Sequence, residues 1–283
     1  MNKKNRKRSR KLKAALFYSF NTCLGLLFMF PLIYMLISSF NAERSLPVQI
    51  QSFWEFFPNK WTLNNFANVF TRIPMLKYIG NTLLYALGSV IIGMLVNSLA
   101  GYALAKFNFT GKKFLLNFIV IMLIIPFEGI TLSLYIVVNR LELLNTPFAI
   151  ILPSLMSCFY IFMFRQFFLG VPNELLEAAE VDGAGPLRTY FGVVLPTAVP
   201  VFITVFVLDF FAKWNDFYWP MLTLTNKDLF NVQLAITAFN REPPYHFGEV
   251  MASLSIVTIP IIVMFLFLQK YYISGIATTG IKE

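Results

Sequence analysis

A short polar segment, residues 172–196, interrupts a chain that is otherwise strongly apolar. Its acidic and small residues recur at helical spacing: Glu174, Glu177, Ala178, Ala179 and Glu180. Carboxylates in the first turns of a helix interact favourably with the helix dipole, and alanines leave a compact face. The pattern suits docking of an amphipathic helix into a groove on a partner, and the alternative is a cytoplasmic loop with surface helices and no partner.

The segment also contains signals that start and stop helices. Asn173, after Pro172, is predicted to be the N-cap of a short helix. Gly183 and Gly185 are predicted to end that helix, and Pro186 suits the first turn of another. The result is a helix, a break and a second helix, too short and too charged to enter lipid.

Long stretches with no charge, or with one, lie around this segment and must position it. They run between Lys13 and Glu43, Lys77 and Lys106, Lys113 and Arg140, Glu142 and Arg165, Arg188 and Asp209, and Glu249 and Lys270. A helix of about 20 apolar residues crosses the hydrocarbon core, whereas barrel strands are about 10 residues long and alternate in polarity. The chain is therefore predicted to be an all-α membrane protein with six transmembrane helices.

The predicted helices divide the chain into a tail, a first helix, an outer loop and a membrane core. The helices are expected at about 14–40, 78–105, 114–138, 146–168, 189–211 and 250–270. Residues 1–13 form a basic tail, 41–76 an outer loop, 77–270 a core of five helices, and 271–283 a C-terminal tail. A cytoplasmic N-terminus places 15 of the 23 Lys and Arg residues inside, in agreement with the positive-inside rule, so both termini are predicted to be cytoplasmic.

Two carboxylates fall inside or near predicted spans. Charged groups in the membrane are costly and are functional candidates. Asp209 can reach Lys213, four residues later, whereas Glu128 stands alone two residues after Pro126. We favour a packing or pathway-lining role for both carboxylates. The alternative is an ion-coupled or proton-coupled secondary transporter that uses them.

Three groups of residues in the polar segment occur at characteristic offsets: Glu177-Ala178-Ala179, Asp182-Gly183-Ala184 and Val193 to Pro196. This order resembles the EAA loop of permease subunits of binding-protein-dependent ABC importers. The resemblance implies the type I ABC importer permease fold, with a cytoplasmic coupling helix that contacts a separate ATPase. The residues implied in that coupling are Glu174, Glu177, Ala178, Ala179, Asp182, Gly183, Ala184 and Pro196.

Further motifs resemble the smaller permease subunit of the maltose-type carbohydrate importers. They are Trp61-Thr62-Leu63-x-Asn65-Phe66, Ala100 to Ala105 with Phe109-x-Gly111, Arg165 to Phe168, Trp214 to Phe217, and Gln269 to Gly275. Two features depart from that pattern. Glu180 and Val181 stand where the family often has a basic residue and Ile, and residues 240–247 are divergent, which leaves the identity of the sugar open.

The resemblance also implies partners: a second, related permease subunit, two ATP-binding subunits and an extracytoplasmic solute-binding protein. The loop before the last helix is the candidate contact with that binding protein, through Asn240, Arg241, Glu242, Tyr245 and His246. His246, the single histidine, is expected to be a solvated loop residue. The expected location is the bacterial plasma membrane.

Other function classes are poorly matched. The chain lacks the G-x-x-x-x-G-K-[ST] motif, so no cofactor is expected on it, and ATP and Mg²⁺ would be bound by the partner ATPase. With one histidine and two cysteines, no catalytic or metal site is predicted, and the protein is not expected to be an enzyme. The basic tail suits anionic membrane lipid rather than nucleic acid.

Overall fold

The apolar windows form long helices in the computed structural model, which describes residues 3–42, 56–243 and 246–279. Within these residues the only bridge between extended segments joins Asn41 and Trp61. Four of the described helices are long and apolar enough to cross a membrane, and the number is six if each of two bent helix pairs is one span. This agrees with the predicted all-α fold and its six spans.

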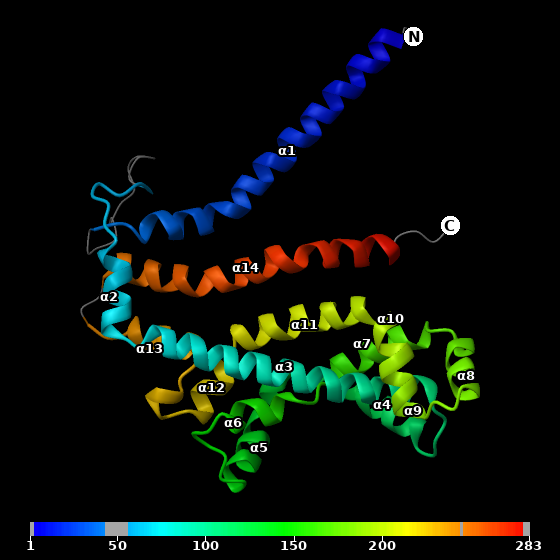
Figure 1. The fold of residues 1–283 in the computed structure, drawn as a ribbon. Helices are drawn as coiled ribbons and strands as arrows, with labels where there is room; N and C mark the ends of the chain where they lie inside the picture. The colour runs from blue at the N-terminus through cyan, green and yellow to red at the C-terminus, as the bar shows by residue number, and fades with distance from the viewer. Residues whose placement is uncertain (1–2, 43–55, 244–245, 280–283) are drawn as a thin grey trace. The chain divides into compact units, whose positions relative to one another are not determined.

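The chain divides into two compact units (Figure 1). The first contains Met1–Ile73 and Asn240–Thr258, and the second contains Pro74–Phe239 and Ile259–Glu283. The predicted single core over residues 77–270 therefore differs from the packing, because residues 240–258 join the N-terminal unit.

The first unit is built from α1 (Lys3–Ser38), α2 (Asn64–Arg72) and the beginning of α14 (Phe247–Thr279). The predicted outer loop thus contains a helix, α2. Asn65 in α2 donates hydrogen bonds from Nδ2 to the carbonyl oxygens of Ser39, at 2.9 Å, and Asn41, at 2.7 Å. These bonds hold α2 against the chain that leaves α1.

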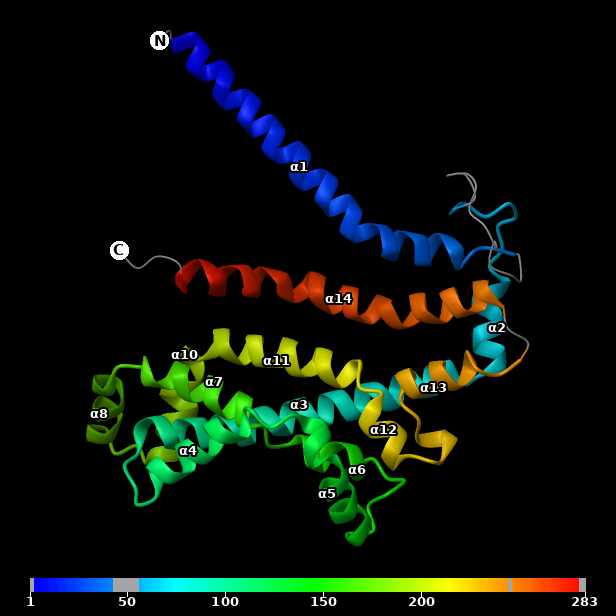
Figure 2. The same ribbon diagram turned by 180° about the vertical axis from the view of Figure 1, so that it is seen from behind.

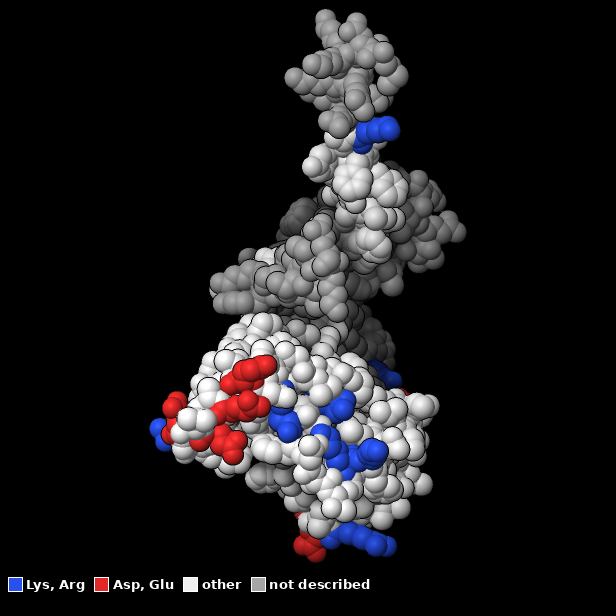
Figure 3. Space-filling model, turned by 90° about the vertical axis from the view of Figure 1, so that its right-hand side faces the viewer, with Lys and Arg blue, Asp and Glu red and all other residues white. Residues whose placement is uncertain are grey.

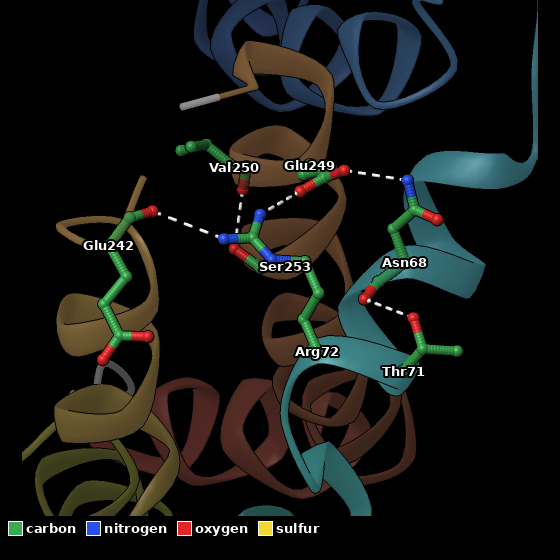
Figure 4. A network of polar contacts seen from close by, with 7 residues as sticks. All are labelled: Asn68, Thr71, Arg72, Glu242, Glu249, Val250 and Ser253. Carbon is green, nitrogen blue, oxygen red and sulfur yellow. Dashed lines mark hydrogen bonds and ion pairs between the residues drawn. The ribbon is translucent and has the colours of Figure 1, made fainter. Parts of the chain in front are cut away.

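A second group of polar contacts joins α2 to α14 (Figure 4). Arg72 forms an ion pair with Glu249, whose side chain is only 3% exposed. Asn68 Nδ2 donates a second hydrogen bond to Glu249, at 2.8 Å, and Arg72 also reaches the carbonyl oxygen of Glu242, at 3.3 Å. The buried carboxylate is therefore both charge-paired and hydrogen-bonded, as a buried charge requires.

The second unit contains the remaining described elements. They are α3 (Met75–Lys106), α4 (Lys112–Met122), α5 (Phe127–Arg140), α6 (Phe148–Ile151), η2 (Leu152–Ser154), α7 (Cys158–Leu169), α8 (Asn173–Val181), α9 (Pro186–Thr189), η3 (Tyr190–Val194), α10 (Leu195–Thr197), α11 (Val199–Trp214), α12 (Tyr218–Thr223), η4 (Lys227–Leu229) and α13 (Val232–Phe239). α3 is the central helix of this unit, and α7 and α11 pack along it (Figures 1 and 2).

Close approach of α3 and α7 depends on Gly101. A Cβ at this position would lie 2.7 Å from Phe164 Cβ and 2.9 Å from the backbone nitrogen of Arg165. Small residues let the backbones of neighbouring membrane helices approach closely, and Gly101 does so here. The core beside this contact contains Tyr102, Phe164, Phe168, Val171, Tyr190, Val194, Ala198, Val201 and Val205.

Three predicted helices are interrupted. The helix expected at 114–138 is divided into two helices, α4 and α5. Their axes differ by 109°, and the break between them ends at Pro126. The residue before a proline is disfavoured in helical conformation, which accounts for the break. The helix expected at 189–211 bends by 80° after Thr197, where α11 begins with a proline in its first turn.

The helix expected at 146–168 is interrupted at residues 155–157, between η2 and α7. Asn97 of α3, which is 1% exposed, satisfies both sides of this break. Its Nδ2 donates to the carbonyl oxygen of Leu155 at 3.2 Å, and its Oδ1 accepts from the backbone N–H of Ser157 at 2.9 Å. Backbone groups without a helical partner need such a substitute when they are buried.

The bounds of the outermost helices also differ from the prediction. α1 begins at Lys3 rather than near residue 14, and α14 continues to Thr279 rather than ending near residue 270.

Candidate functional site

The polar segment forms two short helices at one end of the second unit, where α8 lies beside α9 (Figures 1 and 2). Pro186 begins α9, as predicted. The cap of α8 differs from the prediction: Pro172 occupies the N-cap position, no side chain caps the helix, and Asn173 is its first residue. The Asn173 side chain does not cap the helix because its Oδ1 accepts a hydrogen bond from Lys106.

Lys106, the last residue of α3, holds the entry to α8. Its Nζ donates to the carbonyl oxygen of Val171, at 2.5 Å, and to Asn173 Oδ1, at 2.8 Å. The amide of Asn173 is therefore engaged by a lysine of the central helix. This contact joins the polar segment to the end of a long membrane helix.

The C-terminus of α8 is closed by a Schellman motif. Gly183 has φ +76° and donates its N–H to the carbonyl oxygen of Glu180 at 2.9 Å, while Ala184 donates to Ala179 at 2.9 Å. These two bonds define the motif, and its central position requires the left-handed conformation that glycine adopts without strain. The prediction that Gly183 ends this helix is confirmed.

The outward face of α8 carries apolar as well as acidic side chains. Val181 is 88% exposed, Leu187 of α9 is 64% exposed and Leu175 is 42% exposed. Ala178 and Asp182 are also exposed, whereas Ala179 is buried against the unit. Figure 3 shows an acidic patch beside a basic patch at this end of the second unit. Apolar side chains on a polar projection are typical of a surface that a partner covers.

A cleft of about 550 Å³ lies between α8, α9 and the end of α3. Glu177 and Glu180 line it from α8, and Lys106 and Tyr102 line it from α3. The three acidic residues of α8 therefore differ in direction: Glu174 does not line this cleft, whereas the other two do. An acidic rim with a lysine at the base can accept polar groups of a partner.

The residues after α9 anchor the projection in the core. Tyr190 is fully buried in a π-helical turn, η3, and its hydroxyl lies 2.6 Å from Ser98 Oγ of α3. Pro196 lies beyond this turn in α10, separate from the cluster formed by the other predicted coupling residues on α8 and its C-terminal turn. π-helical turns occur frequently at functional sites.

The predicted loop for binding-protein contact lies in the first unit. Arg241 and Glu242 are exposed, and Tyr245 lies outside the described residues. His246 differs from the expectation of a solvated residue, because its Nδ1 is buried without a hydrogen-bond partner among the described residues, as is Asn240 Oδ1. His246 and Glu249 both line a small cavity of about 180 Å³.

The two candidate pathway carboxylates lie in different environments. Glu128 is exposed in the first turn of α5, whereas Asp209 is 3% exposed and lines a cavity together with Lys213 and Asp216. The structure does not assign Glu128 to that cavity. Burial raises the pKa of Asp216 above its ordinary value, and a hydrogen bond from the Trp219 backbone N–H opposes this shift.

Comparison with known proteins places this chain among transport components. Residues 89–277 match the family described as "binding-protein-dependent transport system inner membrane component". The arabinooligosaccharides transport system permease protein AraQ of Halalkalibacterium halodurans is 31% identical, with 90% of this chain and 91% of AraQ covered. The lactose transport system permease protein LacG of Rhizobium radiobacter is 28% identical, with 94% and 96% covered.

A solved structure has the same fold. A chain of a bacterial ABC transporter involved in the import of the acidic polysaccharide alginate superposes with a TM-score of 0.82 at 21% identity, covering 94% of this chain and 98% of that one. The secondary-transporter alternative finds no support in these comparisons. The protein belongs to the family of binding-protein-dependent transport system inner membrane components, and it is a membrane permease subunit rather than an enzyme.

Proposed function

We propose that this chain is the permease subunit of an ATP-driven importer for sugars and that α8 is its contact with a separate ATP-binding subunit. The observation that carries this proposal is the exposed apolar and acidic face of α8, which is fixed at both of its ends. Lys106 holds the entry and Tyr190 anchors the exit in the core. Because α8 is fixed at both ends, a movement of the bound ATP-binding subunit is transmitted to the membrane helices.

The proposed substrate class is a saccharide. The names of AraQ and LacG refer to arabinooligosaccharides and lactose, and a further relative, 27% identical, is the maltodextrin transport system permease protein MdxG of Bacillus subtilis. The names of these relatives refer to different sugars of one class. We propose saccharides as the substrate class of this chain and do not assign it a particular sugar.

The proposed partners are a second, related permease, two ATP-binding subunits and an extracytoplasmic solute-binding protein. ATP and Mg²⁺ would be held by the ATP-binding subunits, with no cofactor on this chain. The protein would lie in the bacterial plasma membrane with both termini cytoplasmic, a topology supported by the excess of Lys and Arg in the inner segments. The binding protein would approach the outer segment that contains Asn240, Arg241, Glu242 and Tyr245.

Site-specific cross-linking tests the proposed contact. In a background without Cys23 and Cys158, Val181→Cys is expected to cross-link to the ATP-binding subunit in the assembled importer, because residue 181 is 88% exposed on the outward face of α8. Leu141→Cys, at a position 61% exposed after α5, is the matched control and is expected not to cross-link to that subunit. The proposal fails if Val181→Cys gives no adduct or if both variants give the same one.

A further inference from the structure

The cavity that contains Asp209 lies where three interruptions of the helices meet. Its volume is about 280 Å³. Phe127 follows the break between α4 and α5, Ser157 belongs to the break before α7, and Asp216 lies in the turn after α11. Non-helical backbone within a membrane is tolerated where it is buried in protein or lines a water-filled cavity, and interrupted helices form substrate sites in transporters.

Polar and charged side chains line part of the cavity. Asp209 is 3% exposed, Tyr160 lines the cavity beside it, and Lys213 lies one helical turn further along α11. Asp216 adds a second carboxylate to the lining. Two carboxylates and one lysine give the lining a formal charge of −1, and free acceptor positions remain because each carboxylate accepts up to about four hydrogen bonds.

Three aromatic side chains also line the cavity, and two of them are held by contacts with their neighbours. The Trp219 indole donates from Nε1 to the carbonyl oxygen of Ala149 at 2.9 Å, which sets the plane of its ring. Phe127 packs edge-on against Trp219, with ring centroids 6.0 Å apart and planes at 80°. Phe159, 50% exposed, adds a third ring. Rigid aromatic faces beside a few placed polar groups are typical of small-molecule sites.

We propose that this cavity is a binding subsite, on this subunit, for one uncharged ring of the transported saccharide. The inference rests on the proposed function and names the place where this chain contacts its substrate. A sugar ring has hydroxyl groups at its edge and C–H groups on its faces. Hydroxyl groups donate charge-assisted hydrogen bonds to Asp209 and Asp216, and C–H faces pack on the rings of Trp219 and Phe159. The net negative charge disfavours a uronate.

Uptake by the complete importer in proteoliposomes tests the subsite. The probe is the neutral sugar transported fastest among radiolabelled arabinobiose, lactose and maltotriose. Asp209→Asn and Asp216→Asn are each expected to lower the maximal uptake rate about tenfold, the loss that follows when a hydrogen bond to a charged acceptor is weakened. The half-saturating sugar concentration is expected to stay within about twofold, because the binding protein sets it.

ATP hydrolysis separates a substrate role from a structural one. In both variants, hydrolysis stimulated by the sugar-loaded binding protein is expected to stay within about twofold, so that ATP used per sugar rises about tenfold. Asp228→Asn is the control with the same chemistry, since Asp228 is 72% exposed, pairs with Lys77 and lies outside the cavity. Unchanged uptake in both cavity variants, or a parallel loss of uptake and hydrolysis, overturns the subsite. If no sugar-loaded binding protein stimulates ATP hydrolysis by the wild-type importer, that result contradicts the proposed function itself.

Photolabelling of the wild-type importer tests the subsite without depending on the folding of any variant. A diazirine derivative of the same sugar, photolysed during turnover, is expected to label peptides that contain Phe159 or Trp219. Labelling confined to the other permease subunit overturns the subsite.

Discussion

Arg72 of α2 forms an ion pair with Glu249 of α14, 177 residues further along the chain. Asn68 donates to the same carboxylate, so the acid receives two donors from one short helix. Glu249 is almost fully buried, whereas Arg72 is 26% exposed. The contact thus joins the start of the last helix to the segment that precedes the second span.

Removing one partner of this pair is expected to be worse than removing both. Arg72→Met leaves the buried Glu249 charge without its ion pair, at a cost of about 3 kcal/mol in the free energy of unfolding. Arg72→Met/Glu249→Gln is expected to recover part of that loss. Thermal unfolding of the purified protein in detergent measures both. A double variant less stable than Arg72→Met would contradict the assignment.

Gly101→Ala is expected to destabilise the second unit by about 1–3 kcal/mol, because the added Cβ would overlap Phe164 Cβ and the Arg165 backbone. Gly80→Ala, on the same helix, is the control: nothing lies within 4 Å of its Cβ, and the helix preference of alanine predicts a gain of up to about 1 kcal/mol. Thermal unfolding of the two variants side by side checks this. Equal stability would show that α3 and α7 separate easily.

Gly183 is expected to tolerate asparagine better than alanine, and alanine better than valine. No atom lies within 4 Å of a Cβ at this position, so the penalty arises from φ +76° rather than from a clash. It amounts to roughly 1–2 kcal/mol for an ordinary L-residue. ATP-coupled sugar uptake at equal membrane levels is the measurement. Gly185→Ala is the control, because Gly185 has φ −72°; a larger loss there than in Gly183→Val would refute the argument.

The membrane architecture could be predicted because the length of an apolar window is a local property of the sequence. The breaks within the membrane helices were harder to predict from the sequence. Pro126 stands at one break, but a proline inside a span often only kinks a helix, as Pro31 lies inside α1 without ending it. What permits the break at residues 155–157 is the amide of Asn97, about 60 residues earlier. No window of sequence contains both partners.

The residues of the candidate site also fall into those that act locally in the sequence and those that meet only in the folded chain. Gly183 and Pro186 act through local backbone geometry, and both were assigned correctly from the sequence. Lys106 was missed, and with it the true use of Asn173, because the two residues meet only when α3 packs beside the polar segment. Tyr160 was missed as a neighbour of Asp209 in the same cavity for the same reason. A polar amide inside an apolar window, such as Asn97, is a signal that could have indicated a buried contact between helices.

Asn97 provides the last prediction. Asn97→Leu keeps a similar volume but removes the donor to Leu155 and the acceptor for Ser157, so that two buried backbone groups lose their partners. Each such group costs about 1–3 kcal/mol. When protonated, the carboxyl of Asn97→Asp keeps an acceptor for the Ser157 N–H and an O–H donor for the Leu155 carbonyl oxygen, so its loss of stability is expected to be smaller than that of Asn97→Leu. Thermal unfolding at acidic and neutral pH tests both variants: because burial favours the neutral form, Asn97→Asp should be more stable at the lower pH relative to wild type, whereas Asn97→Leu should show the same deficit at both. A pH-independent deficit in Asn97→Asp would mean that its side chain has left the break for water.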